Sequence, residues 1–91
     1  MMKVESMQTA KVDELFFLEQ RFYTELGKVI RNHRRSMNFS QDYMAAKLKI
    51  SQNAYSKIET GKCGCSVYRL MQILSLLQLE PQAVLNLDHM N

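Results

Sequence analysis

The stretch SQNAYSKIETGK, residues 51–62, predicts a short helix with an unusual polar face. Ser51 can cap the start of a helix, and Gly61 can end one. Three residues at helical spacing would form its apolar inward face: Ala54, Tyr55 and Ile58. The outward face carries amide, hydroxyl and amine groups where a solvated helix usually has Glu–Lys pairs. These outward residues are Gln52, Asn53, Ser56 and Lys57. They indicate either a hydrogen-bonding surface for a ligand or an ordinary solvated face.

A second short helix is expected immediately upstream, over residues 41–48. Ser40 can cap it, and its apolar positions are Met44, Ala45 and Leu48. Three residues, 49–51, then separate the two helices. Short helices joined in this way cross at a steep angle, as in a helix-turn-helix, and the small side chain of Ala45 suits the crossing. The second helix covers about residues 51–59. On duplex DNA its first turn would enter the major groove.

The rest of the chain also predicts helices. Apolar residues recur at helical spacing over residues 12–35, which indicates one long helix, or two helices with a break near Thr24 or Gly27. Ser66 can cap a further helix, and Pro81 suits the first turn of a last helix that ends near residue 87. The apolar face of the helix after residue 66 would consist of Leu70, Ile73, Leu74 and Leu77. No run alternates apolar and polar residues as a strand would. We expect an all-α fold of five helices with an N-terminal helical extension.

Length, charge and hydropathy narrow the class further. The 91 residues fit one small domain, which we divide into an N-terminal extension (1–22), the domain itself (23–87) and a tail (88–91). The net charge is +3, but residues 21–69 hold ten Lys or Arg against three Asp or Glu. This excess indicates a polyanion-binding surface, although small basic proteins are common. No apolar run is long enough to span a bilayer and no signal peptide is visible, so we expect a cytoplasmic protein outside membranes.

The segment LGKVIRNHRRSMNFSQDYMAAKLKISQNAYSKIETGK, residues 26–62, resembles the phage repressor and Cro-like helix-turn-helix family, also called the xenobiotic-response-element type. The resemblance continues more weakly through SVYRLMQILSLLQLEPQAVL, and covers about residues 24–87. It implies a repressor-like DNA-binding domain. The sequence departs from the family at three positions. Lys49 and Gln78 stand where Gly is common, and Cys65 stands where Pro or another loop-forming residue is usual.

The resemblance also implies a role for each polar residue of the two short helices. Base contacts would come from Gln52, Asn53, Ser56 and Lys57. Gln41 and Ser51 would hold phosphates at helix N-termini, and Lys62 would hold the next phosphate. The chemistry agrees, because Gln or Asn can bond adenine N6 and N7 together, and Lys can donate to guanine O6 and N7. Arg34 and Glu59 match a family pair that joins the first helix to the third.

The resemblance implies a transcriptional regulator, most simply a repressor, that binds double-stranded DNA as a homodimer. The alternative is an antitoxin-type module that binds a partner protein as well as its own operator. Apolar residues for the contact between chains are available at Phe16, Phe17 and Leu18, or at Val84 and Leu87. We favour the N-terminal set.

Enzyme chemistry finds little support in the central region. Glu59 and His33 are the plausible acid–base groups there. No activated nucleophile or phosphate-binding Gly-rich loop is visible. We therefore expect neither an enzyme nor a cofactor.

The run Cys63-Gly64-Cys65 raises the question of a metal or redox site. Two thiols fall short of a four-ligand zinc site, and only His33 and His89 could add to them. Gly64 more simply serves a turn in a loop near the DNA backbone. We therefore expect no metal.

Overall fold

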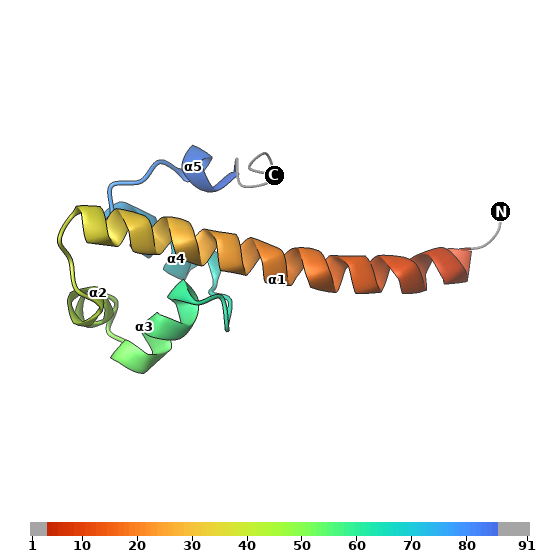
Figure 1. Cartoon of the computed structure of the whole chain (residues 1–91), viewed down its shortest axis with the longest axis horizontal. Coiled ribbons are helices and arrows are strands. Elements are labelled where there is room, and N and C mark those ends of the chain that lie inside the picture. Colours follow the sequence, from red (N-terminus) through yellow and green to blue (C-terminus); the bar gives the residue numbers. More distant parts are fainter. Residues whose placement is uncertain (1–3, 86–91) are drawn as a thin grey trace.

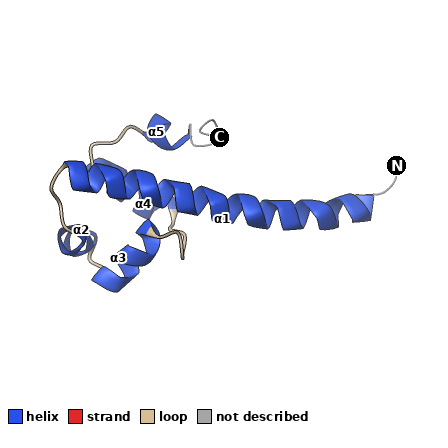
Figure 2. Cartoon of the chain, in the orientation of Figure 1, coloured by secondary structure: helices blue, strands red, loops and turns tan. Residues whose placement is uncertain are grey.

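The structure, a computed structural model, describes residues 4–85, and within them the side chains of residues 13–84. This range holds five α-helices and no strand (Figure 1, Figure 2). They are α1 (Val4–Ser36), α2 (Gln41–Leu48), α3 (Gln52–Glu59), α4 (Val67–Leu76) and α5 (Pro81–Leu85). The all-α fold expected from the sequence is confirmed. Within the same range, no helix is long and apolar enough to cross a membrane.

The helix α1 is continuous, which settles the question left open for residues 12–35. The hydroxyl of Thr24 donates to the carbonyl oxygen of Gln20 at 2.9 Å, within the helix itself. Gly27 lies where α1 meets α3, and a methyl group there would overlap the carbonyl oxygen of Glu59. Gly27 therefore permits α1 and α3 to pack closely, and it does not end α1. The N-terminal half of α1 projects beyond the other helices (Figure 1), which gives the structure an elongated shape of 54 × 25 × 19 Å.

The hydrophobic core lies between the C-terminal half of α1 and the other helices. Its buried members are Leu26, Ile30, Met44, Ala45, Leu48, Tyr55, Ile58, Ile73, Leu74, Leu77 and Val84. These include the inward face predicted for α2 and most of the faces predicted for α3 and α4, where Ala54 and Leu70 are half-buried. Val84 is packed into this core, so it is not available for a contact between chains. Leu87, the other C-terminal candidate, lies outside the described residues, as does the predicted end of α5 near it.

Serine caps begin three of the helices, as predicted. Ser40, Ser51 and Ser66 each accept a hydrogen bond from the backbone N–H three residues later, at 2.9–3.0 Å. Such a cap satisfies one of the N–H groups that the first helical turn leaves without a partner. The sequence therefore predicted these helix starts to within one residue.

The turn between α2 and α3 has a left-handed backbone at Lys49, with a φ of 61°. In this conformation the N–H groups of Lys49 and Ile50 reach the carbonyl oxygens of Ala46 and Ala45, at 3.1 and 3.0 Å. Gln78, after α4, has a φ of 54°. Both residues stand where the family commonly has Gly, which adopts this conformation without the steric cost of a side chain.

We expect Lys49→Gly to stabilise the protein by up to about 1 kcal/mol, because Gly removes the steric cost of a left-handed side chain. Lys47→Gly is the matched control, since it removes the same charge from the last turn of α2, where Gly costs about 1 kcal/mol. The free energies of unfolding in urea measure both. Equal destabilisation by the two changes would show that the backbone at Lys49 carries no such cost.

Candidate nucleic-acid interface

The helices α2 and α3 meet at the crossing that the sequence predicted, and α3 presents the predicted polar face outward. Ala45 is buried at 3% exposure, which allows the two helices to approach closely. Gln52, Asn53 and Lys57 are exposed on α3, and Ser56 is half-buried. All four side chains come from the first two turns of one short helix. Their donors and acceptors therefore face a common surface, which continues onto the start of α2.

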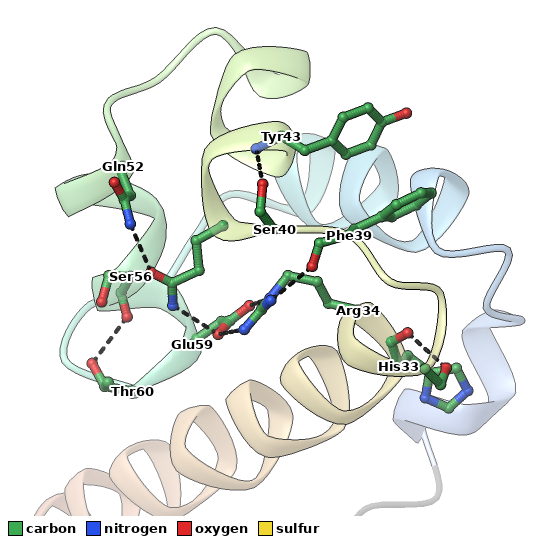
Figure 3. Close-up of polar contacts among 11 residues, drawn as sticks. His33, Arg34, Phe39, Ser40, Tyr43, Gln52, Ser56, Glu59 and Thr60 are labelled. Atoms are coloured by element: carbon green, nitrogen blue, oxygen red, sulfur yellow. Dashed lines mark hydrogen bonds and ion pairs between the residues drawn. The ribbon is translucent and has the colours of Figure 1, made fainter.

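The N-termini of α2 and α3 contribute backbone donors to this surface. The first residues of a helix have no intrahelical acceptor for their N–H groups, and these groups attract anions. At α3, the Ser51 hydroxyl oxygen accepts the N–H of Ala54 at 3.0 Å, which leaves its own hydrogen free to donate outward. At α2, the corresponding capping oxygen belongs to Ser40 (Figure 3). Each start can thus offer N–H groups to a phosphate.

A buried ion pair lies behind the surface (Figure 3). Arg34 donates from Nε to Glu59 Oε2 at 2.6 Å and from Nη2 to Glu59 Oε1 at 3.2 Å. Its third group, Nη1, donates to the carbonyl oxygen of Phe39 at 2.8 Å. The two side chains are 9% and 1% exposed. The pair therefore joins the end of α1, the end of α3 and the segment before α2.

The ion pair continues as a chain of hydrogen bonds to the surface. Gln41 Nε2 donates to Glu59 Oε1 at 3.0 Å, and Gln41 Oε1 accepts from Gln52 Nε2 at 3.4 Å. Glu59 accepts only, so it turns the NH₂ group of Gln41 inward and the oxygen of Gln41 towards Gln52. Sequence reasoning missed this link. Its signal was the presence of Gln at the first position of both helices.

The Gln41 side chain is thus occupied between Glu59 and Gln52. The phosphate contact expected of Gln41 would then rest on its backbone N–H at the start of α2. This refines the expectation without removing it.

Hydrogen bonding outweighs burial at the carboxyl of Glu59. Burial alone would raise its pKa, but the hydrogen bonds, first that from Arg34 and also that from Gln41, bring the pKa below the ordinary value of 4.5. The hydrogen bond with Glu59 likewise raises the pKa of Arg34. Both groups therefore remain ionised at neutral pH, and Glu59 presents no unpaired charge to an anion.

Lys62 lies directly after α3 in an exposed position. Gly61 has a φ of 77° and turns the chain, and the N–H of Lys62 then donates to the carbonyl oxygen of Lys57 at 2.9 Å. The backbone at Lys62 is thus tied to the end of α3. Lys62 follows Lys57, the last residue of the polar face, by five positions in the sequence.

A second contact that the sequence did not indicate involves Arg69. Its Nη1 donates to the carbonyl oxygen of Leu48 at 2.7 Å, and to Gln72 Oε1 at 3.3 Å. This guanidinium satisfies a carbonyl at the C-terminus of α2 and so ties α4 to the helix-turn-helix. No local pattern in the sequence distinguishes Arg69 from a surface cation.

A family model for helix-turn-helix domains matches residues 30–84, more than half of the chain. The chain belongs to this family, the XRE-type, Cro-like helix-turn-helix, as the sequence resemblance implied. The family consists of DNA-binding transcription regulators rather than enzymes. Comparison with curated proteins and with solved structures gave no significant match. The surface formed by α2 and α3 is therefore the candidate DNA interface.

We expect the Arg34–Glu59 pair to be strongly coupled in stability. Arg34→Met and Glu59→Gln should each cost about 3–5 kcal/mol, because each leaves one buried charge without its partner. The double variant should cost less than the sum by about 1–3 kcal/mol. Urea unfolding of the four proteins measures this coupling.

The exposed pair Lys28–Glu25, with an N–O distance of 3.3 Å, is the matched control. Because solvent screens it, its double-mutant cycle should be additive to within about 0.5 kcal/mol. Additivity at Arg34 and Glu59 as well would mean that the buried contact does not hold α1 to α3.

Proposed function

We propose that the protein is a sequence-specific transcriptional repressor that binds double-stranded DNA as a homodimer, with α3 in the major groove. The observation that carries this proposal is the row of polar side chains on α3, of which Gln52 is held from behind by a hydrogen bond to Gln41. The N-terminal turn of α3 has free N–H donors and uncharged amide side chains. Such groups can form hydrogen bonds with base edges in the major groove. Repression needs only occupancy of the operator, whereas activation needs a further surface. A cytoplasmic location accords with this role.

The orientation of Gln52 suggests a preferred base. One hydrogen of its NH₂ group is directed to Gln41. The other hydrogen and the oxygen remain for a ligand, which makes one donor beside one acceptor. Adenine presents the complementary pair, N7 and N6–H₂, in the major groove. We propose that Gln52 reads an adenine, and that Asn53, Ser56 and Lys57 contact the neighbouring bases.

Phosphate contacts would position the helix without reading sequence. We assign them to the backbone N–H groups at Gln41 and Ser51, to the Ser51 hydroxyl and to the ammonium group of Lys62. Each cation that neutralises a phosphate releases counterions, so affinity should fall linearly with salt on logarithmic axes.

We expect Gln52→Ala to reduce sequence specificity and Lys62→Ala to reduce affinity for every duplex. Gln52→Ala should cost about 1–3 kcal/mol on the preferred duplex and little on unrelated duplexes, because Gln52 neutralises no phosphate. Lys62→Ala should weaken all duplexes alike and reduce the salt slope by about 1. Selection from a random DNA pool supplies the preferred duplex, and competition titrations between about 50 and 200 mM salt measure both effects.

Gln82→Ala, at an exposed position of α5, is the matched control and should change neither property. A uniform loss of affinity in Gln52→Ala would move base reading to another residue. An affinity that does not change with salt concentration would contradict the proposed phosphate contacts.

The projecting half of α1 supports the proposed dimer. Leu15, Phe16, Phe17 and Leu18 are 57–72% exposed, although such large apolar side chains rarely cluster on a free surface. Leu15, Leu18 and Phe22 follow one another at helical spacing and lead into the buried Leu26. The apolar stripe of the core thus extends beyond the domain. A second copy would cover it and would place two recognition helices on half-sites about 34 Å apart.

We expect the double change Leu15→Glu and Leu18→Glu to raise the dimer dissociation constant at least tenfold, which is about 1.4 kcal/mol. Charges would then replace apolar contact area, while both positions are exposed in the single chain, so its stability should change little. Gln20→Glu, also exposed on α1, is the control for added charge. Sedimentation of these variants, and of a chain lacking residues 1–20, measures association.

An unchanged dissociation constant in the variants would exclude the N-terminal contact and move the search to residues beyond Val84. A protein that is monomeric at all concentrations would favour the alternative, in which the projecting half of α1 binds a partner protein as an antitoxin does.

A further inference from the structure

The loop between α3 and α4 holds both cysteines in an anchored stretch of backbone. The N–H groups of Lys62 and Cys63 both donate to the carbonyl oxygen of Lys57, at 2.9 and 3.4 Å. Gly64 rests against the ring of Tyr23 on α1, and a methyl group at Gly64 would overlap that ring. The structure thus gives Gly64 a packing role, and the turn near the DNA backbone expected from the sequence stays a prediction. The contact also fixes the residue that separates the two thiols.

Both cysteines line one pocket. Cys63 is exposed and Cys65 is half-buried, and both are free cysteines. They line a pocket of about 300 Å³ together with Ile50, Ala54, Ile58, Gly64, Ser66 and Arg69. The two cysteines thus share one pocket and are separated by a single residue.

The residues that line this pocket offer few types of metal ligand besides the two thiols. No carboxylate or imidazole is among its lining residues. Nowhere in the described part of the chain do three His, Cys, Asp or Glu side chains gather as metal ligands do. His33 is on α1 and does not line the pocket, and His89 lies outside the described residues. The two cysteines therefore do not supply the four ligands that a structural zinc site takes.

We propose that Cys63 and Cys65 form a chelating site for a soft, two-coordinate monovalent cation, of which Cu(I) is the biological representative. Thiolate sulfur selects Cu(I) over hard cations, and two ligands suffice for a linear d¹⁰ centre. The one-residue spacing, with Gly64 packed against Tyr23, brings both cysteines to the same pocket. This assignment replaces the expectation that the two cysteines bind no metal.

Binding is balanced in protons and charge. Two thiols lose two protons, two S–Cu bonds form, and the product is a bis-thiolate complex of charge −1, with no change in the oxidation state of sulfur or copper. The guanidinium of Arg69 lines the same pocket and provides a compensating positive charge. Its hydrogen bonds to Leu48 and Gln72 hold it in place.

The test uses the reduced full-length chain under anaerobic conditions, with Cu(I) delivered from its coloured bicinchoninate complex. We expect the chain to withdraw one Cu(I) per molecule without a change in its oligomeric state. Cys63→Ser and Cys65→Ser should each weaken binding by more than the roughly 10–100-fold that loss of an outer-shell partner costs. Because Cys63 is exposed, Cys63→Ser should keep the urea midpoint of the parent protein.

Met71→Leu is the matched control, since it removes an exposed thioether, also a soft ligand, from α4. It should leave copper binding unchanged. Retention of binding within tenfold in either serine variant would overturn the chelate. So would one Cu(I) shared by two chains, or displacement of Cu(I) by equimolar Zn(II).

Discussion

The buried contact between Arg34 and Glu59 is the interaction on which the arrangement of the interface depends. A buried ion pair is weak evidence for stability, because desolvation of both charges offsets their attraction. Its larger effect is on position. The guanidinium bonds α1 to the end of α3 and also to the carbonyl oxygen of Phe39, so the end of α1, the end of α3 and the segment before α2 meet at one group. Gly27 makes the close approach of α1 and α3 possible, because any side chain there would overlap the backbone of α3.

The same carboxylate orders the polar surface. Glu59 can only accept hydrogen bonds, so it sets the direction of the amide of Gln41, which in turn sets that of Gln52. A surface glutamine normally samples many rotamers, and ordering it on binding costs free energy. Part of that cost is met here before a ligand arrives. The chain of hydrogen bonds thus couples a buried charge pair to the orientation of an exposed residue, Gln52.

The sequence predicted the short helices well, because their signals are local. Serine caps and apolar spacing do not depend on the rest of the fold. The Arg34–Glu59 pairing came from family resemblance, since the two residues are 25 positions apart and no local rule joins them. The continuity of α1 remained open because Gly27 and Thr24 both weaken a helix locally. Tertiary packing decided it, through the close contact of Gly27 with α3. The bonds from Gln41 to Glu59 and from Arg69 to Leu48 were missed, because each joins two different helices and no local pattern in the sequence pairs them.

Net charge is a poor guide to the number of phosphate contacts in such a protein. Several of the ten basic residues in 21–69 already have partners. Arg34 is buried with Glu59, Arg69 is bonded to a carbonyl oxygen, and Lys28 lies 3.3 Å from Glu25. A cation that keeps its protein partner neutralises no phosphate and releases no counterion. Each phosphate that is neutralised contributes about 0.9 to the salt slope. The slope would therefore report exposed cations that meet a phosphate, as proposed for Lys62, rather than the basic composition of the chain.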